Sequence, residues 1–360
     1  SNEDTGTIDG VKYDHVFPIE VDQTGGGVAK LQIGYNNGEN PFVAAQRFID
    51  AHMLPQHHLA EIADYIQKRV GNAAPTIGMD TPQTIATTTT YEHLPMKGYK
   101  TFELSKAVNF GKMRTKLEEM NQLTDADFAC FERLTETLSA TNRYHASKID
   151  TDGLALIKRM LIEWPAAQAF PALDLARLSV LHPDAAKNAQ YWSGVLRSAF
   201  RQCGQVTDAD RTAVTAVPML TLRFICNCFR GGPGSLGAVS AMLNETMALS
   251  EHHLGSNNKN IRLSVATVLL NVSSFLKSDP NGTNVSQAIV KQAHKILESK
   301  KYESEAIVRT LVGLGTALLA REEAKETARS LYLVSKVEMF ASPHGDKAKA
   351  VAKEIYAILS

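Results

Sequence analysis

The strongest constraint on the fold of this chain is an apolar helical pattern that recurs four times in its second half. The four similar segments begin at Phe170, Val217, Ile261 and Ala306. Their common register aligns Arg177, Arg223, Thr267 and Arg309, at spacings of 46, 44 and 42 residues. These spacings are typical of HEAT and armadillo repeats, which recur about every 40 to 47 residues. Because such a unit buries its apolar face only against the next unit, the pattern predicts an all-α armadillo-like solenoid. An irregular helical bundle is the alternative.

The first 71 residues follow a different pattern. Apolar and polar residues alternate over 13–21, and residues 29–33 also favour a strand, so two strands are predicted. The three glycines at 25–27 supply a reversal, which predicts that the two strands form a hairpin. Pro18 cannot donate a hydrogen bond to a neighbouring strand, which favours an edge position for the first strand.

Two amphipathic helices are predicted after this hairpin. Asn40 is a suitable N-cap for a helix that starts at Pro41, where the missing N–H has no cost. A second helix is predicted from Gln56 to Val70. The predicted organisation is residues 1–10 as a disordered end or a remnant of expression, 11–71 as a small α+β module, 72–98 as a linker rich in Pro, Thr and Gly, and 99–360 as the helical domain.

Charge and composition disfavour several classes of protein. Residues 1–90 carry 5 Lys+Arg and 11 Asp+Glu (−6), whereas residues 91–360 carry 33 and 27 (+6). This division disfavours a uniformly basic nucleic-acid-binding protein and favours an acidic partner for the second part. No apolar stretch approaches the ~18 to 20 residues of a bilayer span, and no signal-peptide pattern opens the sequence, so we expect no membrane partner and no export. The four cysteines suit a reducing compartment.

The sequence contains no catalytic or cofactor motif that we can identify. It lacks Gly-x-Ser-x-Gly, a phosphate-binding loop with Lys, and His-Glu-x-x-His. Cys226 and Cys228 are two residues apart on a predicted helix and point in nearly opposite directions, so we expect core packing and not a metal site. We therefore expect a protein that is not an enzyme and holds neither cofactor nor metal. The alternative is an enzyme in which the glycine-rich residues 231–237 cover a pocket.

One repeated pair of positions predicts a peptide-binding groove. Arg223 and Asn227 are four residues apart and lie on one helical face. The same register places Thr267 with Asn271 and Arg309 with Gly313. On the inner face of a solenoid, a repeated Asn can hydrogen-bond an extended peptide backbone, and Arg can pair with carboxylates. The alternative is that both arginines reach only neighbouring loops of their own chain.

Several segments resemble one known family. In the first part these are Tyr13-Asp-His-Val-Phe-Pro-Ile-Glu-Val, Gly34-Tyr-Asn-Asn-Gly-Glu-Asn-Pro-Phe and Glu61-Ile-Ala-Asp-Tyr-Ile. They resemble the PFU domain, the ubiquitin-binding module of the phospholipase A2-activating protein/Doa1 (Ufd3) family. In the second part they are Phe170-Pro-Ala-Leu-Asp-Leu-Ala-Arg-Leu-Ser, Leu222-Arg-Phe-Ile-Cys-Asn-Cys-Phe, Gly255-Ser-Asn-Asn-Lys-Asn-Ile and Arg309-Thr-Leu-Val-Gly-Leu-Gly-Thr. They resemble that family's PUL domain, an armadillo-type solenoid. Family members usually carry a WD-repeat propeller ahead of these domains, so we expect this chain to be a fragment.

The resemblance implies an adaptor of the AAA+ ATPase valosin-containing protein, called Cdc48 in yeast. In that family the PUL groove holds the acidic C-terminal tail of the ATPase, and the PFU domain binds ubiquitin weakly. The candidate tail-binding residues are Arg223, Arg309, Asn227, Asn258, Lys259, Asn260 and Asn271. The candidate ubiquitin-binding residues are Phe42, Phe48, Leu59 and Tyr65, for which core packing is the alternative. The resemblance implies a cytoplasmic and nuclear protein of ubiquitin-dependent degradation. The competing hypothesis is an armadillo-type scaffold that binds peptides or nucleic acid and is unrelated to ubiquitin.

Overall fold

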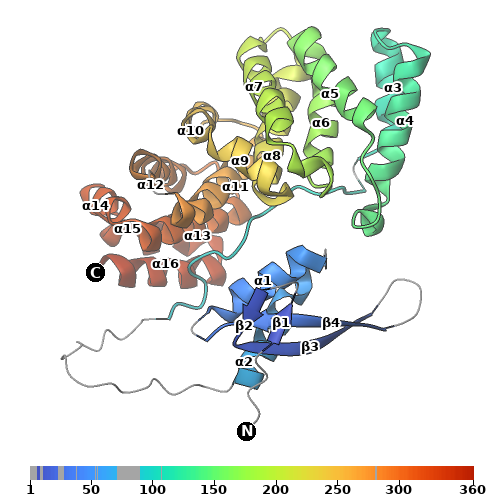
Figure 1. The fold of residues 1–360 in the computed structure, drawn as a ribbon. Helices are drawn as coiled ribbons and strands as arrows, with labels where there is room; N and C mark the ends of the chain where they lie inside the picture. The colour runs from blue at the N-terminus through green and yellow to red at the C-terminus, as the bar shows by residue number, and fades with distance from the viewer. Residues whose placement is uncertain are drawn as a thin grey trace, which may run out of the picture. The chain divides into compact units, whose positions relative to one another are not determined.

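The structure is a computed structural model, and its chain divides into two compact units, Ser1–Thr87 and Thr88–Ser360. The structure describes residues 6–8, 11–22, 28–37, 39–52, 54, 56–70, 90–106, 108–279 and 282–360. The predicted glycine reversal at 25–27 and most of the predicted linker lie outside the described residues. Figure 1 labels the helices and strands of both units.

The first unit contains the predicted hairpin. Strands β3 (His15–Asp22) and β4 (Val28–Tyr35) pair antiparallel, with His15 opposite Tyr35 and Asp22 opposite Val28. The alternating pattern is therefore confirmed as a pair of strands. A second antiparallel pair joins β1 (Gly6–Ile8) to β2 (Val11–Tyr13). The prediction that residues 1–10 are a disordered end is wrong for 6–8, because their backbone is paired with β2.

Two helices complete the core of the first unit. They are α1 (Pro41–His52) and α2 (Leu59–Val70), the latter preceded by the 3-10 turn η1 (Gln56–His58). The Asn40 side chain accepts a hydrogen bond from the Phe42 N–H at 2.9 Å, which confirms the predicted cap. Helix α1 packs against α2 and β4. The buried core comprises Phe17, Ile33, Tyr35, Ala44, Ala45, Phe48, Ile49, Ile62, Ala63 and Ile66.

The second unit is mostly helical. Its α-helices are α3 (Phe110–Met120), α4 (Asp125–Ser139), α5 (Thr151–Glu163), α6 (Phe170–Ser179), α7 (Ala189–Gln205), α8 (Ala213–Gly231), α9 (Pro233–Ser240), α10 (Leu243–His252), α11 (Lys259–Phe275), α12 (Thr283–Glu298), α13 (Ser304–Ala320), α14 (Glu322–Ser330), α15 (Leu333–Ala341) and α16 (Asp346–Leu359). Short 3-10 turns are η2 (Thr141–Arg143), η3 (Ala166–Gln168), η4 (Ala185–Lys187), η5 (Leu276–Ser278) and η6 (Ser342–His344).

The four repeated segments of the sequence form the centre of this unit. They are helices α6, α8, α11 and α13, each of which packs against the next, and α13 packs in turn against α16. We call α6, α8, α11, α13 and α16 the five-helix layer. Helices α7 and α9 pack against α8, while α10 packs against α11 and α12 against α13. The serial packing follows from the repeat, because each apolar helix is covered by its sequence neighbours.

Two glycines allow close backbone contacts in the second unit. A Cβ atom at Gly313 would lie 3.1 Å from the Leu270 Cα, so α13 approaches the backbone of α11 closely. A Cβ atom at Gly234 would lie 2.2 Å from the Lys187 carbonyl oxygen. Gly234 therefore serves close backbone packing. A pocket under residues 231–237 stays an untested alternative.

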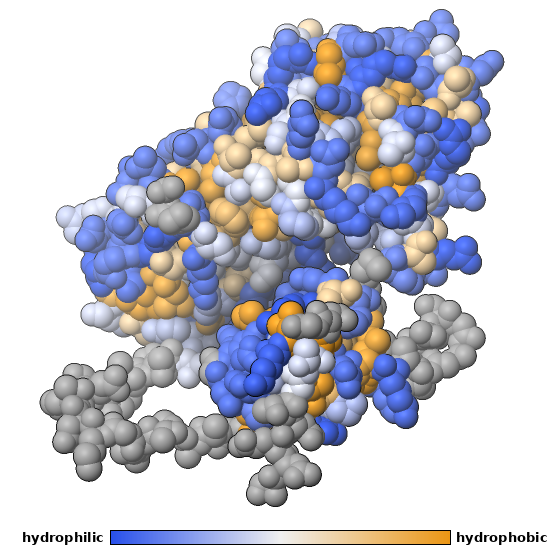
Figure 2. All heavy atoms as spheres, in the orientation of Figure 1, coloured by the Kyte–Doolittle hydropathy of each residue, from blue (hydrophilic) through white to orange (hydrophobic). Residues whose placement is uncertain are grey.

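The surface of the second unit is largely polar. On the face shown in Figure 2, hydrophilic residues cover most of this unit and apolar residues appear between them in smaller groups. Among described residues, the large apolar side chains that are clearly exposed are Val11, Val43, Ile162, Tyr332, Met339 and Tyr356. Within the described part of the chain, none of the helices has the length and apolar character needed to cross a bilayer.

A segment without helix or strand precedes the first helix of the second unit. Residues 91–104, here called the 91–104 segment, pass along the five-helix layer from α16 towards α6 (Figure 1). Leu94 is buried, and its side chain occupies the space next to Gly315 of α13. The predicted boundary at residue 99 is therefore wrong, because residues 91–98 already belong to the packing of the second unit.

Candidate functional site

Side chains of the five-helix layer bind the backbone at the start of the 91–104 segment. The Glu354 carboxylate of α16 accepts hydrogen bonds from the N–H groups of Glu92 and His93, both at 3.0 Å. The Thr316 hydroxyl of α13 accepts one from the Met96 N–H at 2.8 Å. Backbone groups that are removed from water need such partners, so these contacts fix the start of the segment on the five-helix layer.

Two asparagines hold the middle of the segment through both backbone groups of one residue. The Asn271 side chain accepts from the Lys100 N–H and donates to the Lys100 carbonyl, both at 2.8 Å. Asn227 makes the same pair of bonds with Phe102, at 2.8 and 3.0 Å. The chemistry predicted for the repeated Asn is therefore present, although the extended backbone is the chain's own.

These contacts occupy the two asparagine side chains fully. Both residues are completely buried, and their amide nitrogens also donate to carbonyls inside the layer, Asn271 to Cys226 and Asn227 to Arg177. The prediction that Asn227 and Asn271 contact a separate acidic tail is therefore wrong. At the third aligned position Gly313 has no side chain, because α13 lies too close to α11.

Arg223 and Arg309 lie at the same aromatic ring of the segment. The Arg223 guanidinium carbon is 4.8 Å from the centroid of the Phe102 ring, and that of Arg309 is 5.9 Å from it. Arg309 also donates to the Thr267 hydroxyl at 2.7 Å and pairs with the Glu305 carboxylate at 2.5 Å. The shared register predicted from sequence thus brings both arginines to one aromatic ring of the chain's own segment. Their contact with an acidic ligand stays a prediction.

Arg223 carries a positive charge that is not neutralised by an ion pair within the described part of the chain. Its Nε lies 3.4 Å from the Ser264 hydroxyl, and no described carboxylate pairs with it. Burial, and after it the neighbouring Arg177, lower the pKa of Arg223 from its ordinary value. A guanidinium nevertheless stays protonated in proteins, so Arg223 offers charged N–H donors.

A cavity of about 600 Å³ opens beside Phe102, between α3, α6 and α8. Its charged lining residues are Lys112, Lys116, Arg177 and Arg223 against Glu103 and Asp174, which gives 4 − 2 = +2. Its apolar lining residues are Phe102, Val108, Met113, Phe170, Pro171, Met219 and Leu220. Such a lining is complementary to a peptide that combines carboxylates with an apolar side chain.

Arg177 contributes to this cavity without adding a free charge. It is buried and pairs with Asp174 one turn earlier in α6, with Nε 2.7 Å from the carboxylate. It also donates to the Phe102 carbonyl at 2.5 Å. The aligned register places Arg177 with Arg223, but the predicted site did not include Arg177, nor Phe102, Thr316 or Glu354. The register was the signal for Arg177, whereas nothing local marks the other three.

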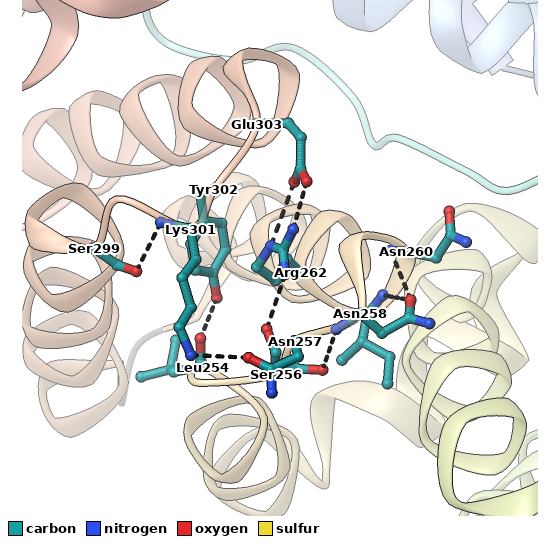
Figure 3. Close-up of polar contacts among 11 residues, drawn as sticks. Leu254, Ser256, Asn257, Asn258, Asn260, Arg262, Ser299, Lys301, Tyr302 and Glu303 are labelled. Atoms are coloured by element: carbon teal, nitrogen blue, oxygen red, sulfur yellow. Dashed lines mark hydrogen bonds and ion pairs between the residues drawn. The ribbon is translucent and has the colours of Figure 1, made fainter. Parts of the chain in front are cut away.

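The remaining predicted tail-binding residues lie at the start of α11. Asn258 is its N-cap, since the side-chain oxygen accepts from the N–H groups of Asn260 and Ile261 at 2.9 and 3.2 Å. Figure 3 shows this cap beside buried Arg262, which pairs with Glu303 and donates to the Ser256 carbonyl. The structure therefore gives Asn258 a capping role. Its contact with a tail, and that of exposed Lys259 and Asn260, stays a prediction.

The predicted ubiquitin-binding residues of the first unit separate into two groups. Phe48 is 4% exposed and belongs to the core, so its prediction as a contact residue is wrong. Phe42, Leu59 and Tyr65 are half-buried and pack against the same core. Tyr65 donates its hydroxyl to the Pro18 carbonyl and carries the Arg69 guanidinium over its ring at 4.8 Å. Ubiquitin contacts by these three residues stay a prediction.

One pair of side chains resembles a nucleophile and its base. The Ser147 hydroxyl lies 2.9 Å from Nε2 of His182. However, the Asp184 N–H donates to Nδ1 of the same ring, so the ring proton is on Nε2 and points towards Ser147. A general base needs the opposite arrangement. Burial also lowers the pKa of His182, so the pair is a structural hydrogen bond.

The thiols and acidic residues form no metal site among the residues that the structure describes. No group of three or more His, Cys, Asp or Glu side chains there is arranged to hold an ion. Cys226 and Cys228 are fully buried in α8, as the core-packing prediction required. Burial raises the pKa of both thiols, which keeps them protonated.

Family models match both units. The model of the PUL domain matches residues 94–354, and the model described as PFU (PLAA family ubiquitin binding) matches residues 1–74. The first match begins within the 91–104 segment, in agreement with its packing on the five-helix layer.

Curated relatives and solved structures are similar over almost the whole chain. A phospholipase A-2-activating protein of Xenopus laevis is 24% identical over 93% of this chain and 48% of its own length. The ubiquitin homeostasis protein lub1 of Schizosaccharomyces pombe is 23% identical over 86% of this chain and 41% of its own. The chain thus spans less than half the length of these relatives. The crystal structure of a PFU-PUL domain pair of Saccharomyces cerevisiae Doa1/Ufd3 is 18% identical, with a TM-score of 0.51 over 99% of this chain and 100% of that one.

Proposed function

Since the chain belongs to the family that joins a PFU domain to a PUL domain, we propose that it is a non-enzymatic adaptor with two binding sites. The second unit binds the acidic C-terminal tail of a AAA+ ATPase of the valosin-containing protein/Cdc48 type. The first unit binds ubiquitin. The linker between them raises the effective concentration of ubiquitinated cargo at the ATPase. We propose that this occurs in ubiquitin-dependent degradation, in the cytoplasm and nucleus.

The observation that carries the tail-binding proposal is the position of Arg223 and Arg309 at one aromatic ring. Two guanidinium groups lie at Phe102, beside a cavity with a net positive lining and apolar walls. Guanidinium groups form strong charge-assisted hydrogen bonds with carboxylates. An acidic peptide with an apolar side chain therefore matches both the charge and the walls of the cavity.

An armadillo-like solenoid is part of the same proposal. Its support is the serial packing of α6, α8, α11, α13 and α16. The first four of these helices each contain one recurrence of the helical pattern, and α16 continues the packing after α13. Such repeats use one continuous face for extended ligands. The 91–104 segment already lies on this face in extended form, which supports the view that the face is suited to peptides.

The ubiquitin-binding half of the proposal is supported by similarity and by partial exposure. The matching family model is described as ubiquitin binding, and one relative is named a ubiquitin homeostasis protein. Phe42, Leu59 and Tyr65 are half-buried, and Val43 on α1 is exposed. Ubiquitin recognition by small domains with apolar, half-exposed side chains is weak because little area is buried.

Calorimetry with an acidic peptide that carries an aromatic residue near its C-terminus tests the tail-binding proposal. We expect the Arg223→Ala/Arg309→Ala double variant to bind at least about 30-fold more weakly than wild type, roughly 2 kcal/mol, because two charged donors are lost. The matched control is Arg143→Ala/Arg211→Ala, which removes two exposed arginines and the same charge. Equal binding by wild type and the first double variant would show that the arginines do not form the site.

An NMR titration with ubiquitin tests the other half. We expect backbone amide resonances between Phe42 and Leu59 to shift with ubiquitin concentration, and Leu59→Ser to reduce these shifts. Resonances of the five-helix layer serve as the internal control and should stay in place. The absence of any shift at millimolar ubiquitin would remove this half of the proposal.

A further inference from the structure

Phe102 belongs to a connecting segment, yet its backbone is held by two helices and its ring lines the cavity. Its backbone is fixed on both sides, because Asn227 binds its N–H and C=O and Arg177 also binds its C=O. Its ring is half-buried, lines the cavity and lies against the guanidinium groups of Arg223 and Arg309. The residue therefore meets both the charged and the apolar parts of the cavity.

The 91–104 segment supplies hydrogen-bond partners to two buried asparagines of the five-helix layer. Asn227 and Asn271 are completely buried, and their side-chain oxygens accept hydrogen bonds from backbone N–H groups of the segment. Unpaired buried amides are strongly unfavourable. Leu94 is also buried against Gly315, so departure of the segment would expose apolar surface. These contacts favour a segment that stays in place when a peptide arrives.

The ring of Phe102 can orient the arginines for a carboxylate. A guanidinium that lies over an aromatic face is attracted to it and keeps its N–H donors in one plane at its edge. Arg223 has no carboxylate partner within the described residues, and its Nε alone donates to Ser264, so its terminal N–H donors are available to a ligand. The same ring, with Phe170 and Met219 of the neighbouring helices, forms an apolar wall of the cavity.

We infer that Phe102 is a direct contact of the acidic peptide, and that the 91–104 segment is a permanent wall of the binding site. This inference rests on the proposed tail-binding function. The peptide's carboxylates pair with Arg223 and Arg309, while its apolar side chain packs against the Phe102 ring inside the cavity. The opposite possibility is that the segment occupies the place of the peptide and competes with it.

Calorimetry with two peptides tests this inference on the full chain. One peptide is acidic with an aromatic residue near its C-terminus, and the other has Ala in place of that aromatic residue. We expect Phe102→Ala to weaken binding of the aromatic peptide about tenfold, and Phe102→Leu to weaken it about threefold, since Leu keeps apolar volume but not the ring face. The Ala peptide should lose much less. The matched control is Tyr91→Ala, which removes an aromatic side chain from the other end of the segment and should leave binding unchanged.

The outcomes separate this inference from the function on which it rests. If wild type and the Arg223→Ala/Arg309→Ala variant bind alike, the proposed function fails, and this inference fails with it. If only the arginine variant binds weakly while Phe102→Ala binds as well as wild type or better, the inference alone is overturned, and tighter binding identifies the segment as a competitor. Should Phe102→Ala not fold, as judged by circular dichroism, Phe102→Leu with the two peptides decides: an equal loss for both peptides overturns the inference.

Discussion

The 91–104 segment makes different contacts at the two ends of the five-helix layer. Near α16 and α13, Leu94 is buried and backbone N–H groups are held by Glu354 and Thr316. Near α8 and α6, the Phe102 ring is half-buried and lies near the guanidinium groups of Arg223 and Arg309 beside a cavity. The first end is closed by apolar burial and hydrogen bonds, whereas the second keeps charge and apolar surface available.

This difference indicates that one segment serves structure at one end and binding at the other. Residues that only close the layer should change stability and leave peptide affinity unaltered. Residues at the cavity should do the reverse. The measurements below test whether stability and peptide affinity depend on different residues of the segment and its partners.

The largest effect is expected at the middle of the segment. Asn271→Ala should lower the free energy of unfolding by about 3 kcal/mol, because the Lys100 N–H and C=O and the Cys226 carbonyl lose a buried partner. Denaturant titration followed by circular dichroism measures it. Asn258→Ala is the matched control: it removes a helix cap and should cost only about 1 kcal/mol. Equal losses for the two variants would show that the segment adds little to stability.

A smaller effect is expected at the closed end. Glu354→Gln should destabilise the chain by about 1.5 kcal/mol, because a carboxylate that accepts from two backbone N–H groups becomes a neutral amide. Peptide affinity should stay within a factor of about two, since the contact is remote from the cavity. A clear fall in affinity would couple the two ends and contradict the division.

Thr316→Val should cost about 1 kcal/mol, since the Met96 N–H loses its acceptor without loss of volume. Hydrogen exchange at the Met96 amide reports it directly, and this amide should exchange faster than in wild type. Thr310→Val is the control, because the Thr310 hydroxyl donates to Ala306 of its own helix. If Met96 exchange is equally fast in both variants, the hydroxyl of Thr316 does not hold the segment.

The smallest expected effect is that of ionic strength, which should change peptide affinity at the cavity more than it changes stability. Raising ionic strength from about 50 to 300 mM should weaken peptide binding about threefold, roughly 0.6 kcal/mol, because charge pairs at Arg223 and Arg309 are screened. Unfolding free energy should change less, since the closed end relies on burial. The Arg223→Ala/Arg309→Ala variant should show little salt dependence. Affinity that is independent of salt in wild type would contradict a charged site.

The sequence alone was sufficient for several local elements of both units, although it missed the pairing of β1 with β2. Alternation over residues 13–21 predicted the hairpin, and Asn40 with Pro41 predicted the start of α1. The spacing of apolar helices predicted that α6, α8, α11 and α13 pack in series. Periodicity is decisive here because it reports which face of an element is apolar.

Periodicity could not distinguish core residues from candidate ubiquitin-contact residues in the first unit. Phe48 and Phe42 lie on the same helix and carry the same side chain, yet Phe48 is buried and Phe42 is half-buried. A small domain needs most of its aromatic residues inside, and only the packing of α1 against β4 and α2 decides which ones.

The sequence predicted the register of Arg223, Asn227 and Asn271. It also predicted that the asparagine amides bind an extended backbone. What only the tertiary structure decided is which backbone it binds. Asn271 and Lys100 are 171 residues apart in the chain, and Asn227 and Phe102 are 125 apart. A repeat shows that a buried amide needs a partner, but the partner is chosen by where a distant segment lies after folding, and no local pattern records that position.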